Sequence, residues 1–329
     1  MSNDKMTAGI FPELPLEKWQ DTKTTLHMWT QVIGKVRLAL TPRENQWWNV
    51  PLYVTSRGLT TSAMPYELRV VQIDFDFINH RLDISSDDGR TESIALEPRS
   101  VADFYNQVMR ALGRLGIDVR IWTMPVEVPD PVPFEKDERH GYDAEYANRF
   151  WQVLVQLDRV FTEFRSRFTG KCSPVHFFWG SFDLAVTRFS GKPANPKPGA
   201  DFITRLSYNA ELSSVGWWAG GGAINGPAFY SYTFPEPEGF AQQKVGPSGA
   251  YYNDKLHEFI LMYDDVRASN GPDAAILEFA QSTYEAGARL QGWPIDEFKL
   301  KSDERSAKAA ADPSQPVSEM AASKAPAND

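Results

Sequence analysis

Large apolar residues recur at alternating steps of three and four in two segments of the chain. The first set is Leu26, Trp29, Ile33, Val36 and Leu40, and the second is Phe150, Leu154, Leu157, Phe161, Phe164 and Phe168. This spacing places each set on one face of a helix, so we expect two long amphipathic helices. An aspartate suited to an N-cap precedes each set, Asp21 in the first and Asp143 in the second.

Each predicted helix is followed by segments in which apolar and polar side chains alternate, as in half-buried strands. These strands are expected at 47–57, 70–78, 80–85 and 91–96, and again at 176–187, 205–217, 227–234 and 258–263. A closing helix follows in both halves, with Phe104 of the first corresponding to Phe279 of the second. We therefore predict an α+β protein of two pseudo-repeated halves, each an antiparallel β-sheet flanked by an N-terminal and a C-terminal helix.

Composition shifts suggest boundaries between these parts. Four prolines between Thr123 and Phe134 favour an extended path and exclude a helix or a central strand. The chain from Ser302 onward contains no aromatic residue and is too polar to form a core. We expect a disordered start at 1–9, a first half at 10–122, a proline-rich linker at 123–142, a second half at 143–301 and a disordered tail at 302–329.

The overall composition narrows the class of protein. Of the 329 residues, 42% are hydrophobic and 23% are charged, which is typical of water-soluble globular proteins. The single cysteine, Cys172, excludes an internal disulfide framework, so we expect a cytoplasmic location. The net charge is −9 and no apolar run is long enough to span a bilayer, so we expect neither a nucleic-acid nor a membrane partner.

Strand alternation also indicates where polar chemistry could gather. Aromatic and polar side chains share one face in both aromatic-rich strands, Trp47 with Arg57 in the first and Trp179 with Asp183 in the second. Such faces are either solvated, as is common in antiparallel sheets, or they line a small-molecule cleft between the halves. The candidate ligand-binding residues are Lys35, Arg37, Trp47, Arg57, His176, Trp179, Asp183, Arg188 and Glu211.

Several of these candidates have a structural alternative. Lys35 and Arg37 could anchor an anionic ligand, or they could be favourable charges near a helix C-terminus. Simple alternation places His176 on the face opposite Asp183 unless Gly180 introduces a bulge, and a structural histidine is the alternative.

Metal and acid–base motifs give little further direction. None of the five histidines stands in an HExxH or HxH spacing, so no metal site is predicted. Asp74 and Asp76 lie two apart on a strand, a spacing that suits either a two-carboxylate site or a solvated strand face. No cofactor is indicated.

Several segments of the chain carry a resemblance to a known family. They are WQDTKTTLHMWTQVIGKVR (19–37), WWNVPLYVTSRGLTT (47–61), IDFDFINHR (73–81), SPVHFFWGSFDLAVTRFSG (173–191), PAFYSYTFPEPEGF (227–240) and QSTYEAGARL (281–290). Together they resemble the bacterial family catalogued as domain of unknown function 5996, over roughly residues 11–293. The resemblance implies a single-unit, stand-alone bacterial protein, and it gives no mechanism. In the family pattern a glutamate often stands at the position of Leu206 and a histidine at that of Ala210, so this chain lacks any chemistry that such a pair would carry.

Two functions remain open at this point. The first is a small-molecule-binding protein, or an enzyme, with a cleft between pseudo-symmetric halves. The alternative is a protein–protein interaction or scaffold protein that self-associates as a homo-oligomer through an aromatic sheet face, without catalysis.

Overall fold

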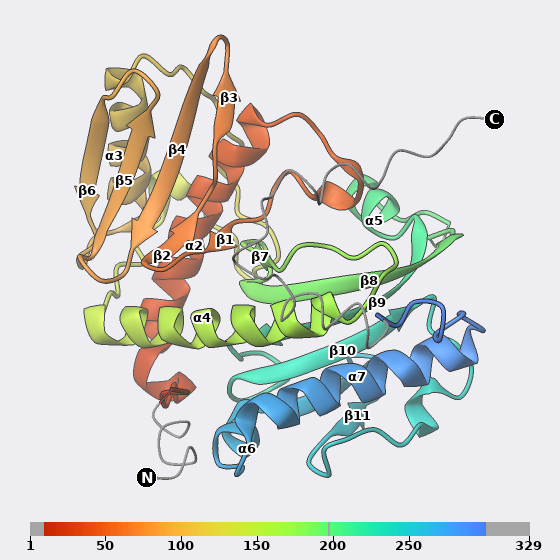
Figure 1. Ribbon diagram of the computed structural model, residues 1–329. Coiled ribbons are helices and arrows are strands. Elements are labelled where there is room, and N and C mark those ends of the chain that lie inside the picture. The colour runs from red at the N-terminus through yellow and green to blue at the C-terminus, as the bar shows by residue number, and fades with distance from the viewer. Residues whose placement is uncertain (1–9, 197, 301–329) are drawn as a thin grey trace, which may run out of the picture.

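A computed structural model of the protein describes residues 10–196 and 198–300. The expected disordered start at 1–9 and tail at 302–329 lie outside the described residues. Within the described part the chain forms two six-stranded antiparallel sheets together with six α-helices (Figure 1). The protein is therefore α+β, as predicted, and both halves follow the predicted order of helix, antiparallel sheet and helix.

The first half contains the first sheet. Its elements are α2 (Leu16–Leu40), η1 (Asn45–Trp47), β1 (Tyr53–Val54), β2 (Gly58–Thr60), β3 (Met64–Tyr66), β4 (Arg69–Asp76), β5 (Arg81–Ser86), β6 (Thr91–Ala95) and α3 (Val101–Arg114). The strand order is β1-β2-β4-β5-β6, with β3 beside β4. Helix α2 begins directly after Pro15, whose fixed φ suits a helix start. The prediction of Asp21 as its N-cap is wrong, because Asp21 lies inside the helix.

The second half contains the second sheet. After η2 (Phe134–Lys136) come α4 (Ala144–Ser166), β7 (His176–Phe178), β8 (Asp183–Pro193), α5 (Phe202–Ser207), β9 (Ala210–Trp218), β10 (Ala228–Phe234), η3 (Phe240–Gln242), β11 (Tyr251–Asn253), β12 (Glu258–Met262), α6 (Tyr263–Arg267) and α7 (Pro272–Leu290). The strand order is β11-β12-β10-β9-β8-β7. Asp143 is the N-cap of α4, as predicted, and its carboxylate accepts from the backbone N–H of Glu145 at 2.8 Å.

The helices bury the apolar face of each sheet in a shared core. In the first half the Trp29 ring of α2 stacks on Phe104 of α3 at 4.7 Å between centroids. In the second half α4 and α7 run along the second sheet (Figure 1), and Phe161 of α4 packs edge-on against Phe229 of β10 at 6.5 Å. Most of the buried apolar residues of both halves belong to one continuous cluster, and Ile224, Ala228 and Ile260 form a small second one.

The two sheets meet edge to edge. Leu52 and Phe177 exchange two backbone hydrogen bonds, each of 2.9 Å, which join the strand β1 region to β7. Nearby, the Trp179 indole lies flat against α2 at Gly34 and donates to the carbonyl of Val50 at 2.8 Å. A Cβ atom at residue 34 would overlap the Trp179 ring, so this helical position requires glycine.

The segment 176–187 differs from the single strand predicted for it. The chain reverses between β7 and β8, and the two strands pair with His176 opposite Ala185 and Phe178 opposite Asp183. Residues opposite each other and residues two apart share a face, so His176 and Asp183 lie on the same side of this hairpin. The sequence-based expectation that they face apart is therefore wrong, because a tight turn was not recognised in the alternating pattern.

Candidate functional site

Polar and aromatic side chains gather on the face of the second sheet that points away from α4 and α7. Because Phe229 of β10 packs on α4, its neighbours Tyr230 and Tyr232 point to the opposite side. We call this surface the tyrosine face; its members are Asp183, Tyr208, Trp218, Tyr230, Tyr232 and Glu258. Apart from the buried Asp183, these side chains are half-buried, so they can be reached from solvent.

Tyr230 crosses a neighbouring strand to reach Asp183. Its ring lies over Gly216 of β9, where a Cβ atom would overlap the phenol, and its hydroxyl donates to Oδ2 of Asp183. The rings of Tyr230 and Tyr232 are nearly parallel, with centroids 6.3 Å apart. The hydroxyl of Tyr232 lies 3.1 Å from that of Tyr208. Because residue 216 of β9 is glycine, the Tyr230 ring can lie flat on that strand and its hydroxyl can reach the buried Asp183 carboxyl group.

The two carboxyl groups of the tyrosine face are held in an environment that disfavours their charge. Asp183 is only 5% exposed, and its Oδ1 has no hydrogen-bond partner among the described residues. Burial raises the pKa of Asp183 to about 7, although the Tyr230 hydrogen bond opposes this. Burial also raises the pKa of Glu258 to about 7. Both carboxyl groups therefore change between their neutral and charged forms near neutral pH.

A second cluster lies where α2, the η1 segment and β7 meet. We call it the Arg37 cluster; its members are Arg37, Trp48, Tyr53, Lys171 and His176. The guanidinium carbon of Arg37 lies 5.6 Å from the Tyr53 ring centroid, and the His176 ring lies 5.7 Å from the same ring. Lys171 lies 5.1 Å from the Trp48 ring. Two cations and an imidazole are thus held against two aromatic rings.

Arg37 is buried and forms no ion pair with a described residue, although the charge of Glu44 is near enough to oppose the lowering of its pKa. The residue is 7% exposed, and its Nε and Nη1 atoms have no hydrogen-bond partner in the described part of the chain. Burial lowers the pKa of Arg37, which shows the cost of holding this charge away from water. Removing an ionic group from water costs several kcal/mol unless a partner compensates for it.

His176 is neutral and also has an unsatisfied nitrogen. The side chain is 1% exposed, and its Nε2 has no partner among the described residues. Burial first, and then the positive charges of Arg37 and Arg165, lower the pKa of His176 to about 3. A neutral imidazole carries one N–H donor and one acceptor, so His176 can complete a hydrogen bond to a polar ligand atom.

The Arg37 cluster and the tyrosine face adjoin each other. His176 pairs with Ala185, so Asp183 is its diagonal neighbour across the β7–β8 hairpin. Such neighbours lie about 7–8 Å apart. The structure thus brings together three of the candidates named from the sequence: Arg37, His176 and Asp183.

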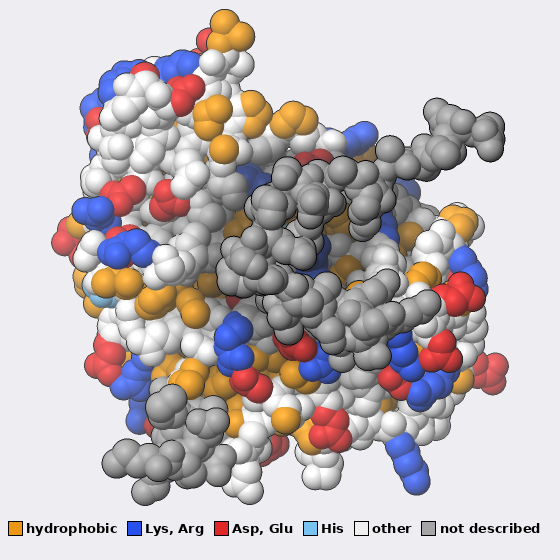
Figure 2. All heavy atoms as spheres, viewed as in Figure 1, with side chains coloured by type: hydrophobic (Ala, Val, Ile, Leu, Met, Phe, Trp, Pro, Cys, Tyr) orange, Lys and Arg blue, Asp and Glu red, His pale blue; other side chains and the backbone are white. Residues whose placement is uncertain are grey.

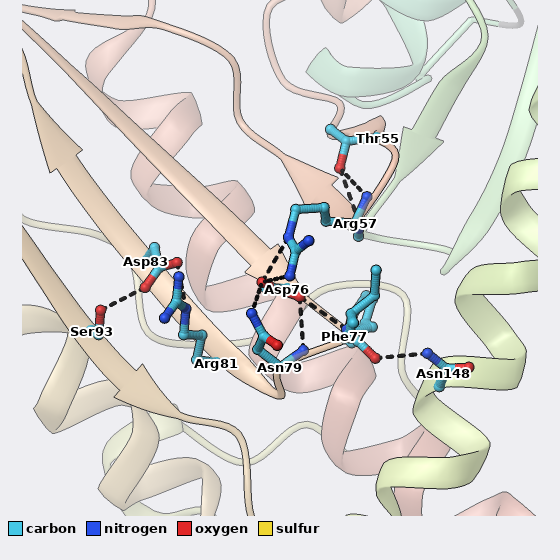
Figure 3. Close-up of polar contacts among 11 residues, drawn as sticks. Thr55, Arg57, Asp76, Phe77, Asn79, Arg81, Asp83, Ser93 and Asn148 are labelled. Carbon is cyan, nitrogen blue, oxygen red and sulfur yellow. Dashed lines mark hydrogen bonds and ion pairs between the residues drawn. The ribbon is translucent and has the colours of Figure 1, made fainter.

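Arg57 lies elsewhere, in the first sheet. It donates from Nε and Nη2 to Oδ2 of Asp76 at 2.9 and 2.8 Å. Asp76 also accepts from the backbone N–H groups of Ile78 and Asn79, each at 2.9 Å, at the β4–β5 turn (Figure 3). Asn148 of α4 donates to the Phe77 carbonyl at 2.9 Å, which ties this turn to the second half. Arg57 is therefore part of a structural junction.

Arg188 and Glu211 lie on the helix side of the second sheet. The Arg188 guanidinium lies 3.5 Å from the Phe164 ring and 4.5 Å from the Tyr284 ring, between α4 and α7. Burial lowers the pKa of Arg188 to about 10. Glu211 accepts from the Ser190 hydroxyl at 2.9 Å. Neither side chain lies on the face that carries Asp183.

The other candidates line different contacts. Lys35 is separated from Arg37 by about 200° around the helix axis, and its ammonium lies 4.7 Å from the Trp122 ring. Burial lowers the pKa of Lys35 to about 8. Trp47 donates to the Ile203 carbonyl at 3.1 Å, and Trp179 is buried against α2 at 7% exposure. None of these three is brought next to Asp183.

Several members of the site were not among the sequence candidates. They are Trp48, Tyr53, Lys171, Tyr208, Trp218, Tyr230, Tyr232 and Glu258. The signal for two of them was present, because Tyr230 and Tyr232 alternate with Phe229 and Ser231 in one predicted strand. No local pattern indicated that Tyr230 would cross β9 to reach Asp183.

Two shallow hollows lie on other parts of the described surface. A shallow hollow of about 430 Å³ is lined by residues including Arg289, Trp293 and Asp296, and another of about 400 Å³ lies beside Met109 and Ile117. On the side shown in Figure 2, basic and acidic side chains are interspersed. Within the described residues no group of three or more His, Cys, Asp and Glu side chains could hold a metal ion. No helix in that part of the chain is both long and apolar enough to cross a membrane.

Comparison with known proteins identifies the family. A family model described as a family of unknown function (DUF5996) matches residues 11–300, so the chain belongs to that family. Neither the curated proteins nor the solved structures contain a match to the chain. The family assignment agrees with the resemblance noted in the sequence, and it assigns no activity.

Proposed function

We propose that this member of the DUF5996 family binds a small organic anion in the Arg37 cluster, next to the tyrosine face. The observation that carries the proposal is the buried Arg37 guanidinium with two unpaired N–H groups. A carboxylate or phosphate oxygen would accept a charge-assisted hydrogen bond from Nη1, and a second oxygen of the same group would accept from Nη2 in the end-on fork geometry that arginine offers. The ligand would thereby compensate the charge that the described residues leave unpaired.

Four neighbours of Arg37 suit a small organic anion. Lys171 adds a second positive charge above the Trp48 ring, and its ammonium donates to the Gln46 side chain at 2.7 Å. His176 can donate one hydrogen bond while staying neutral. The rings of Trp48 and Tyr53 supply apolar walls for the carbon skeleton of the ligand, as in other small-molecule sites.

Other arginines differ from Arg37 in their partners. The Nε and Nη1 atoms of Arg99 also lack a hydrogen-bond partner among the described residues, but Arg99 forms ion pairs with Glu97 and Asp103. Arg188 is as deeply buried as Arg37, but its guanidinium donates to the Phe164 carbonyl and is sandwiched between aromatic rings. Arg57 is largely exposed and bonded to Asp76. Among Arg37, Arg57 and Arg188, Arg37 is the one with two nitrogens that lack a hydrogen-bond partner among the described residues.

Native mass spectrometry of the protein purified without added ligand tests the proposal first. We expect a bound anion that is released on denaturation. Titration calorimetry with hexanoate and with inorganic phosphate then compares the wild type with Arg37→Gln and with the control Arg57→Gln. Arg37→Gln should weaken the better probe at least tenfold, whereas Arg57→Gln should leave its affinity unchanged.

The contrary result is equally defined. If no anion is released and Arg37→Gln binds both probes as the wild type does, the proposal is wrong. A self-associating scaffold would instead show a concentration-dependent mass in sedimentation, sensitive to substitution of exposed aromatic residues such as Phe202, which is 49% exposed.

A further inference from the structure

The tyrosine face carries negative charge that the protein does not neutralise. Asp183 accepts one hydrogen bond, from Tyr230, and its Oδ1 remains unpaired at 5% exposure. The charges that act on Asp183 are those of Glu127 and Glu258, and both are negative. Ser181 donates to Glu127 at the nearby β7–β8 turn. No ion pair to a described cation is formed by Asp183 or Glu258.

Lys23 of α2 reaches the margin of this surface without pairing with its carboxyl groups. Its ammonium lies 5.9 Å from the Trp218 ring and donates to the carbonyl of Gly220. Trp218 lies directly opposite Asp183 in the β8–β9 register. The part of the tyrosine face that carries Asp183 therefore stays acidic, although the Trp218 ring lies next to the Lys23 ammonium group.

The aromatic rings around these carboxyl groups suit a positively charged ligand. Trp218 stands opposite Asp183, and the near-parallel rings of Tyr230 and Tyr232 extend from Asp183 toward Glu258. Aromatic faces attract ammonium groups, and the attraction grows when the site is shielded from water. An unpaired carboxylate oxygen among such rings is an acceptor for an ammonium N–H.

We propose that the tyrosine face binds a primary ammonium group, with Asp183 and Glu258 as its counter-ions and Trp218, Tyr230 and Tyr232 as its walls. The ammonium donates to Oδ1 of Asp183, which has no hydrogen-bond partner among the described residues. This assignment stands on the tyrosine face alone.

The position of this site beside the Arg37 cluster specifies the ligand further. His176 and Asp183 are diagonal neighbours on one hairpin face, and such residues lie about 7–8 Å apart. An anionic group at Arg37 and an ammonium group at Asp183 would then belong to one molecule, an amino acid whose two charges are separated by several carbon atoms. This last step rests on the proposed function.

Four probes of equal chain length separate these claims: hexanoate, hexylammonium, 6-aminohexanoate and hexanol. Each is titrated by calorimetry at pH 8 into the wild type, Asp183→Asn, Glu258→Gln, Arg37→Gln and the control Asp74→Asn. Asp74 is a half-buried strand aspartate of the first sheet, bonded to Gln72 at 2.9 Å. Glu258→Gln keeps the test valid if Asp183→Asn is poorly folded, and circular dichroism verifies the fold of each variant.

We expect hexylammonium to bind at least tenfold more tightly than hexanol, and 6-aminohexanoate to bind more tightly than either singly charged probe. Asp183→Asn and Glu258→Gln should weaken hexylammonium at least fivefold and leave hexanoate unchanged, and Asp74→Asn should change neither. The ammonium site is wrong if hexylammonium binds no better than hexanol or if neither carboxyl variant weakens it. Retained hexylammonium binding without hexanoate binding would overturn the anion proposal alone.

Discussion

Asp76 and Asp183 are both strand aspartates buried to the same degree, with 4% and 5% of their surfaces exposed, yet their carboxyl groups are in opposite states. Asp76 ends β4 in the first sheet and accepts hydrogen bonds from Arg57 and from the turn that follows. These hydrogen bonds and the Arg57 charge outweigh burial and lower the pKa of Asp76. Asp183 begins β8 in the second sheet, accepts only from Tyr230, and has its pKa raised to about 7.

The difference shows that burial alone does not mark a functional carboxyl group. Asp76 has donors on both oxygens and holds a turn and an arginine in place, which is a structural role (Figure 3). Asp183 has an unsatisfied oxygen beside aromatic rings that are open to solvent. Buried polar groups are normally satisfied. The unsatisfied Oδ1 of Asp183 is distinguished from other unsatisfied atoms, such as Nε1 of the core residue Trp29, by belonging to a carboxyl group that lies beside partly exposed rings.

The arginines repeat the same contrast. Arg57 is bonded through two nitrogens to one carboxylate oxygen, and it is largely exposed. Arg37 is buried and has two unpaired nitrogens. Arg57 and Asp76 therefore pair within the first sheet, whereas near the β7–β8 hairpin Arg37 of α2 and Asp183 of β8 form no ion pair with a described residue.

The largest effect on stability is expected from removing the satisfied carboxylate. Asp76→Ala deletes the acceptor of several hydrogen bonds and leaves the turn N–H groups without a partner, so the free energy of unfolding should fall by about 3 kcal/mol. The control is Asp83→Ala in the neighbouring strand, where Asp83 bonds to Arg81 at 2.8 Å in a more exposed position, and a loss below about 1 kcal/mol is expected. Urea unfolding at pH 7 measures both. Equal losses for the two variants would remove the structural role assigned to Asp76.

Local sequence patterns do not predict the contrast between Asp76 and Asp183. The long helices, the order of elements in both halves and the alternation of β4 followed from the spacing of residues such as Ile33, Leu154 and Phe75, because burial of one face imposes a period. The role of Asp76 depends on Arg57 and on a turn, and that of Asp183 depends on Tyr230 crossing β9. Such pairings between distant segments are decided by the register of the strands, which a single sequence does not show.

The next largest effect is expected at Asp183, where substitution should raise the free energy of unfolding, and its size should depend on pH. A carboxyl group with a raised pKa binds its proton more tightly in the folded protein than in the unfolded chain. The protonated Asp183 carboxyl group therefore adds to the free energy of unfolding, fully below pH 4, and this stabilisation is lost as the pH rises through 7. Asp183→Asn removes this loss and should raise the free energy of unfolding at pH 8 by on the order of 2 kcal/mol, with little change at pH 4. Asp76→Asn should destabilise at pH 8, because the pKa of Asp76 is lowered.

Urea unfolding of ligand-free protein between pH 4 and pH 8 measures these slopes. The wild type should lose stability with rising pH more steeply than Asp183→Asn does. If Asp183→Asn is less stable than the wild type at pH 8, then Asp183 is satisfied in a way that its hydrogen bonds do not reveal, and the contrast with Asp76 fails.

The smallest effect concerns which donor lowers the pKa of Asp76. Arg57→Lys keeps a positive charge but loses the paired Nε and Nη2 hydrogen bonds, and because residue 57 is exposed the free energy of unfolding should fall by only about 0.5 kcal/mol. The backbone N–H groups of Ile78 and Asn79 still donate to Oδ1. Titration of the Asp76 carboxyl carbon by NMR should therefore show a pKa that moves toward the ordinary value and remains below it. A pKa raised above the ordinary value would mean that Arg57 alone keeps Asp76 charged. Without Arg57, Asp76 would then resemble Asp183, whose pKa is raised by burial.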